Sequence, residues 1–123
     1  MSLKENKELI RRYYEMYDKG DIDSIMIFVS EDITTTFQGM PAPLDKTGLA
    51  DYMRGFHAGF PNMIHTIRNQ IAEGDQVVTA VSFKGIHSAD LLGVPPSGRS
   101  IEYTEISIHR IVDGTQIGIR DRV

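Results

Sequence analysis

Residues 99–123 read RSIEYTEISIHRIVDGTQIGIRDRV and carry the strongest fold signal in the chain. β-Branched residues are frequent from 99 to 112 and again from 116 to 123, which is typical of strands. Asp113-Gly114 between them is a signal for a tight hairpin turn. The stretch therefore predicts an antiparallel hairpin.

Further strands are predicted at 33–38, 64–72 and 76–87, with Gly74-Asp75 as a turn and 88–98 as a longer loop. Apolar residues recur at helical spacing from 4 to 19, in a short segment capped by Asp21, and in a third segment capped by Asp45 or Thr47 that ends near Pro61. Helices in the N-terminal half and strands in the C-terminal half favour an α+β fold, with helices on one face of an antiparallel sheet.

Composition narrows the functional class. We expect one domain over residues 1–123, because no linker-like stretch divides them. A net charge of −4, without a basic run longer than Arg11-Arg12, argues against nucleic acid as a partner. The absence of cysteine excludes disulfides and thiolate metal sites. No apolar run is long enough for a membrane span and nothing marks the chain for export, so we expect a cytoplasmic protein.

Asp121 is the first candidate catalytic residue. Alternation in the last strand places it on one face with Ile117, Ile119 and Val123, which predicts an inward carboxylate. Desolvation raises the pKa of such a carboxyl group and makes it suitable as a general base. The alternatives are exposure near the chain end and an ion pair with an arginine.

The partners of Asp121 follow from the predicted turn. If Asp113-Gly114 is the centre of a two-residue turn, Asp121 lies opposite Ile106 and Ile119 lies opposite Ile108, with Thr104 nearby. A register slip of one residue would turn the carboxylate outward.

His87 is the second candidate catalytic residue. It continues the inward face of Phe83, where it could orient a substrate oxygen or shuttle a proton. The alternative is a hydrogen bond to a backbone carbonyl.

Glu105, Ser107 and His109 share one strand face and have the residue types of a nucleophilic triad. Residues two apart on a strand stand about 6.5 Å apart with parallel side chains, so the Ser-to-His reach is poor. This face is also opposite to that of Ile106 and Ile108. We therefore expect it to be solvated or, with Tyr103, to form a subunit contact.

Several motifs for bound groups are missing. His57 and His65 complete no metal-binding pattern, and no glycine-rich phosphate loop occurs, so we predict neither a metal nor a cofactor. Tyr13, Tyr14 and Tyr17 form an aromatic stripe that is typical of core, although one hydroxyl could reach a pocket.

Several ordered pieces of the chain resemble the SnoaL-like polyketide cyclases, a branch of the nuclear-transport-factor-2-like superfamily. Phe60-Pro61-Asn62 resembles the family's F-P-D, and residues 73–77 resemble E-G-D-x-V. Residues 85–87 and 92–99 resemble G-T-H and G-I-x-P-T-G-R, the most specific of these motifs, and Arg110 to Gly114 resembles R-x-x-D-G. The resemblance covers nearly the whole chain.

The resemblance implies a cone-shaped domain in which a curved antiparallel sheet and three helices enclose an apolar pocket. In characterised cyclases an aspartate in a final W-D pair is the acid/base of an aldol ring closure without a cofactor, and its position falls on Asp121. Thr115, Gly118 and Arg120 stand where the family usually has lysine, glutamate and tryptophan. We predict that the pocket binds a small apolar ligand, aromatic or polyketide-like, and is lined by Tyr14, Phe37, Phe56, Phe83, Thr104, Ile106 and Ile108.

Three functions remain open at this point. The first is an acid/base enzyme, a cyclase or a ketosteroid-isomerase-like enzyme, in which Asp121 abstracts a proton next to a carbonyl and His87 or a tyrosine stabilises the enolate. The second is a pocket that only binds, which pairing of Asp121 with Arg110 or Arg122 would favour. The third is an interaction domain, and a homodimer or higher oligomer is compatible with all three.

Overall fold

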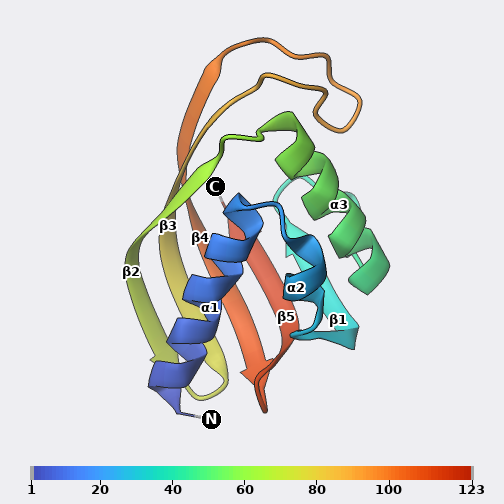
Figure 1. The fold of residues 1–123 in the computed structure, drawn as a ribbon. Coiled ribbons are helices and arrows are strands. Elements are labelled where there is room, and N and C mark those ends of the chain that lie inside the picture. The colour runs from blue at the N-terminus through green and yellow to red at the C-terminus, as the bar shows by residue number, and fades with distance from the viewer. Residues whose placement is uncertain (1, 123) are drawn as a thin grey trace.

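The structure is a computed structural model that describes residues 2–122, and it has three helices over one face of a curved five-stranded sheet in this range (Figure 1). The elements in chain order are α1 (Leu3–Asp18), α2 (Ile22–Met26), β1 (Val29–Phe37), α3 (Lys46–Gly59), β2 (Ile64–Glu73), β3 (Gln76–Ile86), β4 (Ser100–Val112) and β5 (Thr115–Arg122). The predicted α+β class, with three helices over one face of a curved sheet, is confirmed.

Side chains next to each helix explain where the helices begin. Ser2 and Glu5 form a capping box at the start of α1, and Asp21 and Asp45 accept backbone hydrogen bonds at the starts of α2 and α3. After α1 the chain turns at Gly20 with φ +75°, a left-handed conformation that favours glycine. The apolar face of α1 packs onto the sheet.

The strands lie in the order β1-β5-β4-β3-β2. Neighbouring pairs from β2 to β5 are antiparallel, and β1 joins the edge of the sheet parallel to β5. The last strand therefore lies inside the sheet, between β1 and β4, which holds Asp121 beneath the helices (Figure 1).

A β-bulge at Ile117 changes the register that the turn predicts. Ile111 pairs with Gln116, as a two-residue turn requires, but Arg110 then pairs with Gly118. The bulge contributes one extra residue to β5. Asp121 consequently lies opposite Ser107, and the predicted pairing with Ile106 is wrong by one position.

The inward face of β4 is also the opposite of the predicted one. Glu105, Ser107 and His109 are buried, whereas Ile106 is 43% exposed. These three polar residues pair with the buried β3 residues Val81, Thr79 and Val77, and directly opposed residues project to the same side of a sheet. The predictions of a solvated face and of a subunit contact at Ser107 and His109 are therefore wrong.

The loop between β3 and β4 extends past the sheet and packs against the end of α3 (Figure 1). Leu91 occupies the space that a side chain at Gly59 would need, and Leu92 does the same at Gly55. Glycine at these two helix positions permits the close approach.

No helix among residues 2–122 has the length and apolar character needed to cross a bilayer.

Candidate active site

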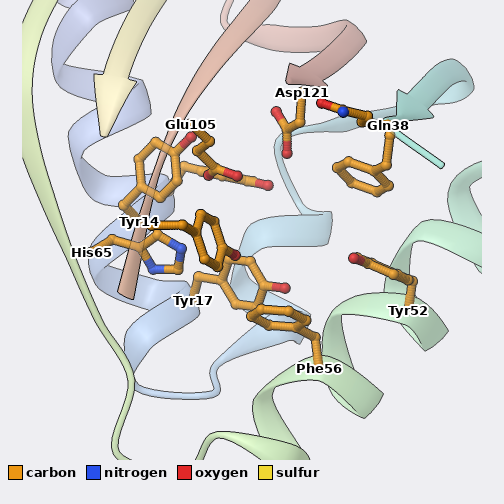
Figure 2. Close-up of a pocket in the computed structure, with 11 residues that line it drawn as sticks. Tyr14, Tyr17, Gln38, Tyr52, Phe56, His65, Glu105 and Asp121 are labelled. Carbon is orange, nitrogen blue, oxygen red and sulfur yellow. The ribbon is translucent and has the colours of Figure 1, made fainter. Parts of the chain in front are cut away.

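A pocket lies between the helices and the inner face of the sheet (Figure 2). All five tyrosines of the chain reach it, and its volume is about 80 Å³. The lining residues are Tyr13, Tyr14, Tyr17, Phe37, Gln38, Tyr52, Phe56, His65, Tyr103, Glu105 and Asp121. The wall is thus aromatic with polar tips, and less aliphatic than the sequence predicts.

Asp121 and Glu105 present two carboxylates to this pocket from neighbouring strands (Figure 2). Asp121 lies opposite Ser107, and Glu105 is two residues from Ser107 on the same face, so the carboxylates are diagonal neighbours. Glu105 is buried, and Oδ1 of Asp121 is enclosed although the residue as a whole is only half-buried.

Both carboxyl groups resist ionisation in this place. Burial, and then the charge of Glu105, raise the pKa of Asp121 well above its ordinary value. Burial also raises the pKa of Glu105, while the nearby His65 lowers it. Because two neighbouring carboxylates repel each other, the pair favours a state with one proton and one negative charge.

Arg110, one of the two arginines predicted to pair with Asp121, bonds to another carboxylate. Arg110 forms its ion pair with Asp75 at 2.8 Å, outside the pocket. Among the described residues, no lysine or arginine lines the pocket. The side chain of Arg122 and the whole of Val123, which we predicted beside Asp121, lie outside the part that the structure describes.

The tyrosine hydroxyls supply neutral hydrogen-bond donors. Burial is the main cause that raises the pKa values of Tyr13, Tyr14 and Tyr17 well above their ordinary value, so these phenols stay protonated. Tyr14 shares a 2.8 Å hydrogen bond with Ser107, directly beside Asp121 in the sheet register. Figure 2 shows the hydroxyl ends of Tyr17 and Tyr52 directed toward the space below Asp121.

His65 is a pocket residue that the sequence argument did not select. Its Nδ1 lies 2.6 Å from Oδ1 of Asp18, and its backbone N–H donates to Oδ2 of the same carboxylate at 2.8 Å. The ring stacks on Tyr17 with centroids 5.4 Å apart. Alternation with the apolar Ile67 could have indicated that His65 faces inward, but nothing in the sequence links it to Asp18.

The predicted ligand contacts separate into two groups. Tyr14, Phe37 and Phe56 line the pocket, and Phe83 lies behind it, packed against Phe56 and Tyr103 with centroids 5.4 and 4.8 Å apart. The prediction fails for Thr104, Ile106 and Ile108, because the shifted register of β4 turns them to the other side of the sheet.

His87 is buried at the far end of β3, outside the lining of this pocket. Its Nδ1 lies 3.1 Å from Oγ of Ser97, and its ring packs against Phe60 at 5.7 Å. A catalytic role of His87 stays a prediction.

The three polar residues of β4 do not form a nucleophilic triad. Ser107 bonds to Tyr14, while Nδ1 of His109 donates to Oε1 of Gln116 at 2.6 Å. Burial lowers the pKa of His109 to about 4, so its ring is neutral near pH 7. Among residues 2–122, no group of three or more acidic and histidine side chains is placed to hold a metal ion.

Comparison with known proteins agrees with this architecture. The family model described as SnoaL-like polyketide cyclase matches residues 7–120, and the chain belongs to this family. No curated protein sequence matches the chain significantly.

Three solved structures illustrate the similarity. AclR from Streptomyces galilaeus, a proposed hydroxylase, is 22% identical with a TM-score of 0.87, over 98% of this chain and 90% of that one. A proposed SnoaL-like polyketide cyclase from Jannaschia sp. CCS1 is 22% identical with a TM-score of 0.87, over 97% and 85%. IdmH from Streptomyces antibioticus, a proposed polyketide cyclase, is 26% identical with a TM-score of 0.83, over 95% and 90%.

Proposed function

We propose that this protein is a cofactor-independent acid/base enzyme that moves a proton next to a carbonyl group, with Asp121 as the catalytic base. The observation that carries the proposal is a carboxylate in an enclosed aromatic pocket, where burial and Glu105 raise its pKa. A base whose pKa approaches the working pH combines ionisation with strong proton affinity. Membership of the SnoaL-like family supports cyclisation as the overall reaction.

The reaction would begin on the singly charged carboxylate pair. Ionised Asp121 takes a proton from the carbon next to the carbonyl, and the electrons of that C–H bond form an enolate. Tyrosine hydroxyls at the pocket wall donate to the enolate oxygen. In a cyclisation the enolate carbon then attacks a second carbonyl of the same molecule, and protonated Asp121 returns its proton to the new alkoxide.

The pocket favours a neutral, flat ligand. Seven aromatic side chains line it, and neither lysine nor arginine does so among the described residues, while Glu105 and Asp121 would repel an anion. The volume of about 80 Å³ is below the range of about 300–1,000 Å³ that is usual for ligand sites. A polycyclic substrate would therefore require the pocket to widen, and a bicyclic ketone, which requires less widening, is the better first probe.

Isotope exchange tests the proton transfer directly. We expect the wild-type protein in deuterated buffer to accelerate deuterium incorporation into 2-tetralone at the carbons beside its carbonyl, followed by proton NMR. Replacement Asp121→Asn should slow the exchange about 10²–10⁴-fold. Asp75→Asn is the matched control, because Asp75 bonds to Arg110 away from the pocket.

Two other results would redirect the proposal. Wild-type protein that binds 2-tetralone without exchanging its protons would contradict catalysis on this ligand and favour a binding module. Exchange that Asp121→Asn leaves unchanged would exclude Asp121 as the base.

An isomerase is the second candidate, because the same groups could return the proton to a different carbon. The five pocket tyrosines provide donors for the intermediate enolate in either case. An unsaturated ketone whose double bond moves into conjugation, detected by ultraviolet absorption, would favour isomerisation over ring closure.

A further inference from the structure

The Asp18–His65 pair lies between two hollows of the protein. His65 lines the inner pocket, and together with Asp18 it also lines a second, outer hollow at the junction of α1 and β2. The His65 side chain is 3% exposed, and the Asp18 side chain is 22% exposed. Asp18 therefore reaches solvent, while the imidazole ring is enclosed.

The hydrogen bonds fix the orientation of the ring. An ionised carboxylate only accepts hydrogen bonds, so the 2.6 Å approach of Asp18 Oδ1 places a proton on Nδ1 of His65. The second carboxylate oxygen is held by the backbone N–H of His65. With Nδ1 occupied by Asp18, Nε2 is the nitrogen that remains for the pocket.

Several ionisable groups surround this ring. Helix α1 contributes Tyr14 and Tyr17 as ring contacts and Asp18 as the hydrogen-bond partner, with Arg11 and Glu15 in the outer hollow. On the sheet side, β4 contributes Tyr103 and Glu105, and β5 contributes Asp121, all of which line the inner pocket with His65. Phe83 of β3 closes the apolar side at 5.3 Å.

We propose that His65, oriented by Asp18, is a second proton-transfer group of this site and acts as the acid that complements Asp121. The inference rests on the proposed function. Protonated His65 would give its Nε2 proton to the ligand's carbonyl oxygen while Asp121 takes the carbon-bound proton, which produces a neutral enol. The reverse transfers return both protons, so each turnover needs no other reactant. Nuclear magnetic resonance can detect the orientation of the His65 ring, with its proton on Nδ1 toward Asp18, without any substrate.

The first experiment therefore follows the ring nitrogens of His65 and the carboxyl carbon of Glu105 through a pH titration. We expect neutral His65 to carry its proton on Nδ1, and the pKa of Glu105 to rise in His65→Gln, because the nearby His65 lowers it in the wild type. Asp18→Asn should remove the Nδ1 preference, because an amide nitrogen replaces one acceptor oxygen. A neutral ring protonated on Nε2, or a Glu105 carbon that does not respond to His65, would overturn the inference.

The second experiment uses deuterium exchange into 2-tetralone. We expect His65→Gln to slow exchange about 10²-fold and Asp18→Asn to slow it by a smaller factor, with Asp75→Asn as the unchanged control. Wild-type protein that never labels the probe contradicts the proposed function. Wild-type labelling that persists undiminished in both His65→Gln and Asp18→Asn overturns the role of His65 alone. Asp18→Asn retains the imidazole ring. If His65→Gln does not fold, the exchange rate of Asp18→Asn can still be compared with that of the wild type.

Discussion

Over residues 105–109, the two faces of β4 reverse the usual distribution of polar and apolar residues. The inner face carries Glu105, Ser107 and His109, all buried, and the outer face carries the exposed Ile106. Buried polar groups cost stability unless they are hydrogen-bonded or used in a site. Ser107 and His109 have hydrogen-bond partners, and Glu105 faces the pocket. The polar residues of the inner face are thus explained by hydrogen bonds and by the pocket. The outer face contributes little to the hydrophobic core.

The largest difference between the two faces should appear in core packing. Ile119, which is 1% exposed and lies opposite His109, packs on the inner side. Its replacement by alanine should lower the free energy of unfolding by about 2–5 kcal/mol, through lost burial and the cavity that remains. Ile106→Ala on the outer face should cost less than about 1 kcal/mol. Urea denaturation measures both, and equal losses would contradict the assignment of faces.

The second prediction concerns the cost of holding Asp121 in the pocket. Its pKa is higher in the folded protein than in the unfolded chain, so the folded state binds the proton more tightly. The contribution of Asp121 to stability should therefore be greatest below about pH 4, near the unfolded pKa, and should be lost as the pH rises through the folded pKa. Asp121→Asn should flatten this decline and make the protein more stable than wild type at high pH. Thermal melts of wild type and Asp121→Asn from pH 3 to pH 9 provide the measurement. A stability difference, wild type minus variant, that does not fall over this range would contradict a buried carboxyl group with a raised pKa.

The third prediction separates the inner from the outer glutamate of β4. The charge of Glu105 raises the pKa of Asp121, so Glu105→Gln should lower it and move the pH dependence of 2-tetralone exchange to lower pH. Glu102 has a 66% exposed side chain next to Lys84, and Glu102→Gln should leave the profile in place. The comparison would fail if both variants moved the profile equally.

The smallest effect should come from single hydrogen bonds on the two sides of the sheet. Tyr14→Phe removes the buried bond to Ser107 and should cost about 0.5–1.5 kcal/mol of stability. Ser82→Ala removes an exposed bond from Nε of Arg68 and should cost about 0.5 kcal/mol or less. Urea titrations of both variants at one pH measure the two losses of stability. A larger loss of stability for Ser82→Ala than for Tyr14→Phe would contradict the prediction.

Local patterns were enough to predict the number and order of the helices and strands, although β1 begins at Val29 and not at the predicted residue 33. Asp21 and Asp45 cap helices where the sequence indicates, and Asp113-Gly114 forms the turn between β4 and β5. These signals act over a few residues, so they can be read without knowledge of the partner strand. The inward position of Asp121 in the pocket was also predicted, although with the wrong neighbours.

The register could not be predicted in the same way. Gly118, next to the bulged Ile117, is the kind of strand glycine that often marks a bulge, but it does not say which way the register shifts. The long loop between β3 and β4 also leaves the pairing of those strands open. Because side chains alternate with a period of two, one extra residue exchanges the faces of a strand. The predicted ligand contacts at Thr104, Ile106 and Ile108 failed because of this exchange of faces. The exchange is also the reason why Glu105 was not predicted as a pocket residue.

The sequence by itself determined the order of the elements, the α+β class, the family resemblance and the choice of Asp121 as the candidate base. Only the tertiary structure decided that Glu105 joins Asp121, that all five tyrosines converge on one pocket, and that Asp18 holds His65 at its wall. Helix caps and turns depend on neighbours in the chain, which the sequence states. The site depends on residues as far apart as Asp18 and Asp121, whose meeting is set by strand register and by the packing of α1 on the sheet.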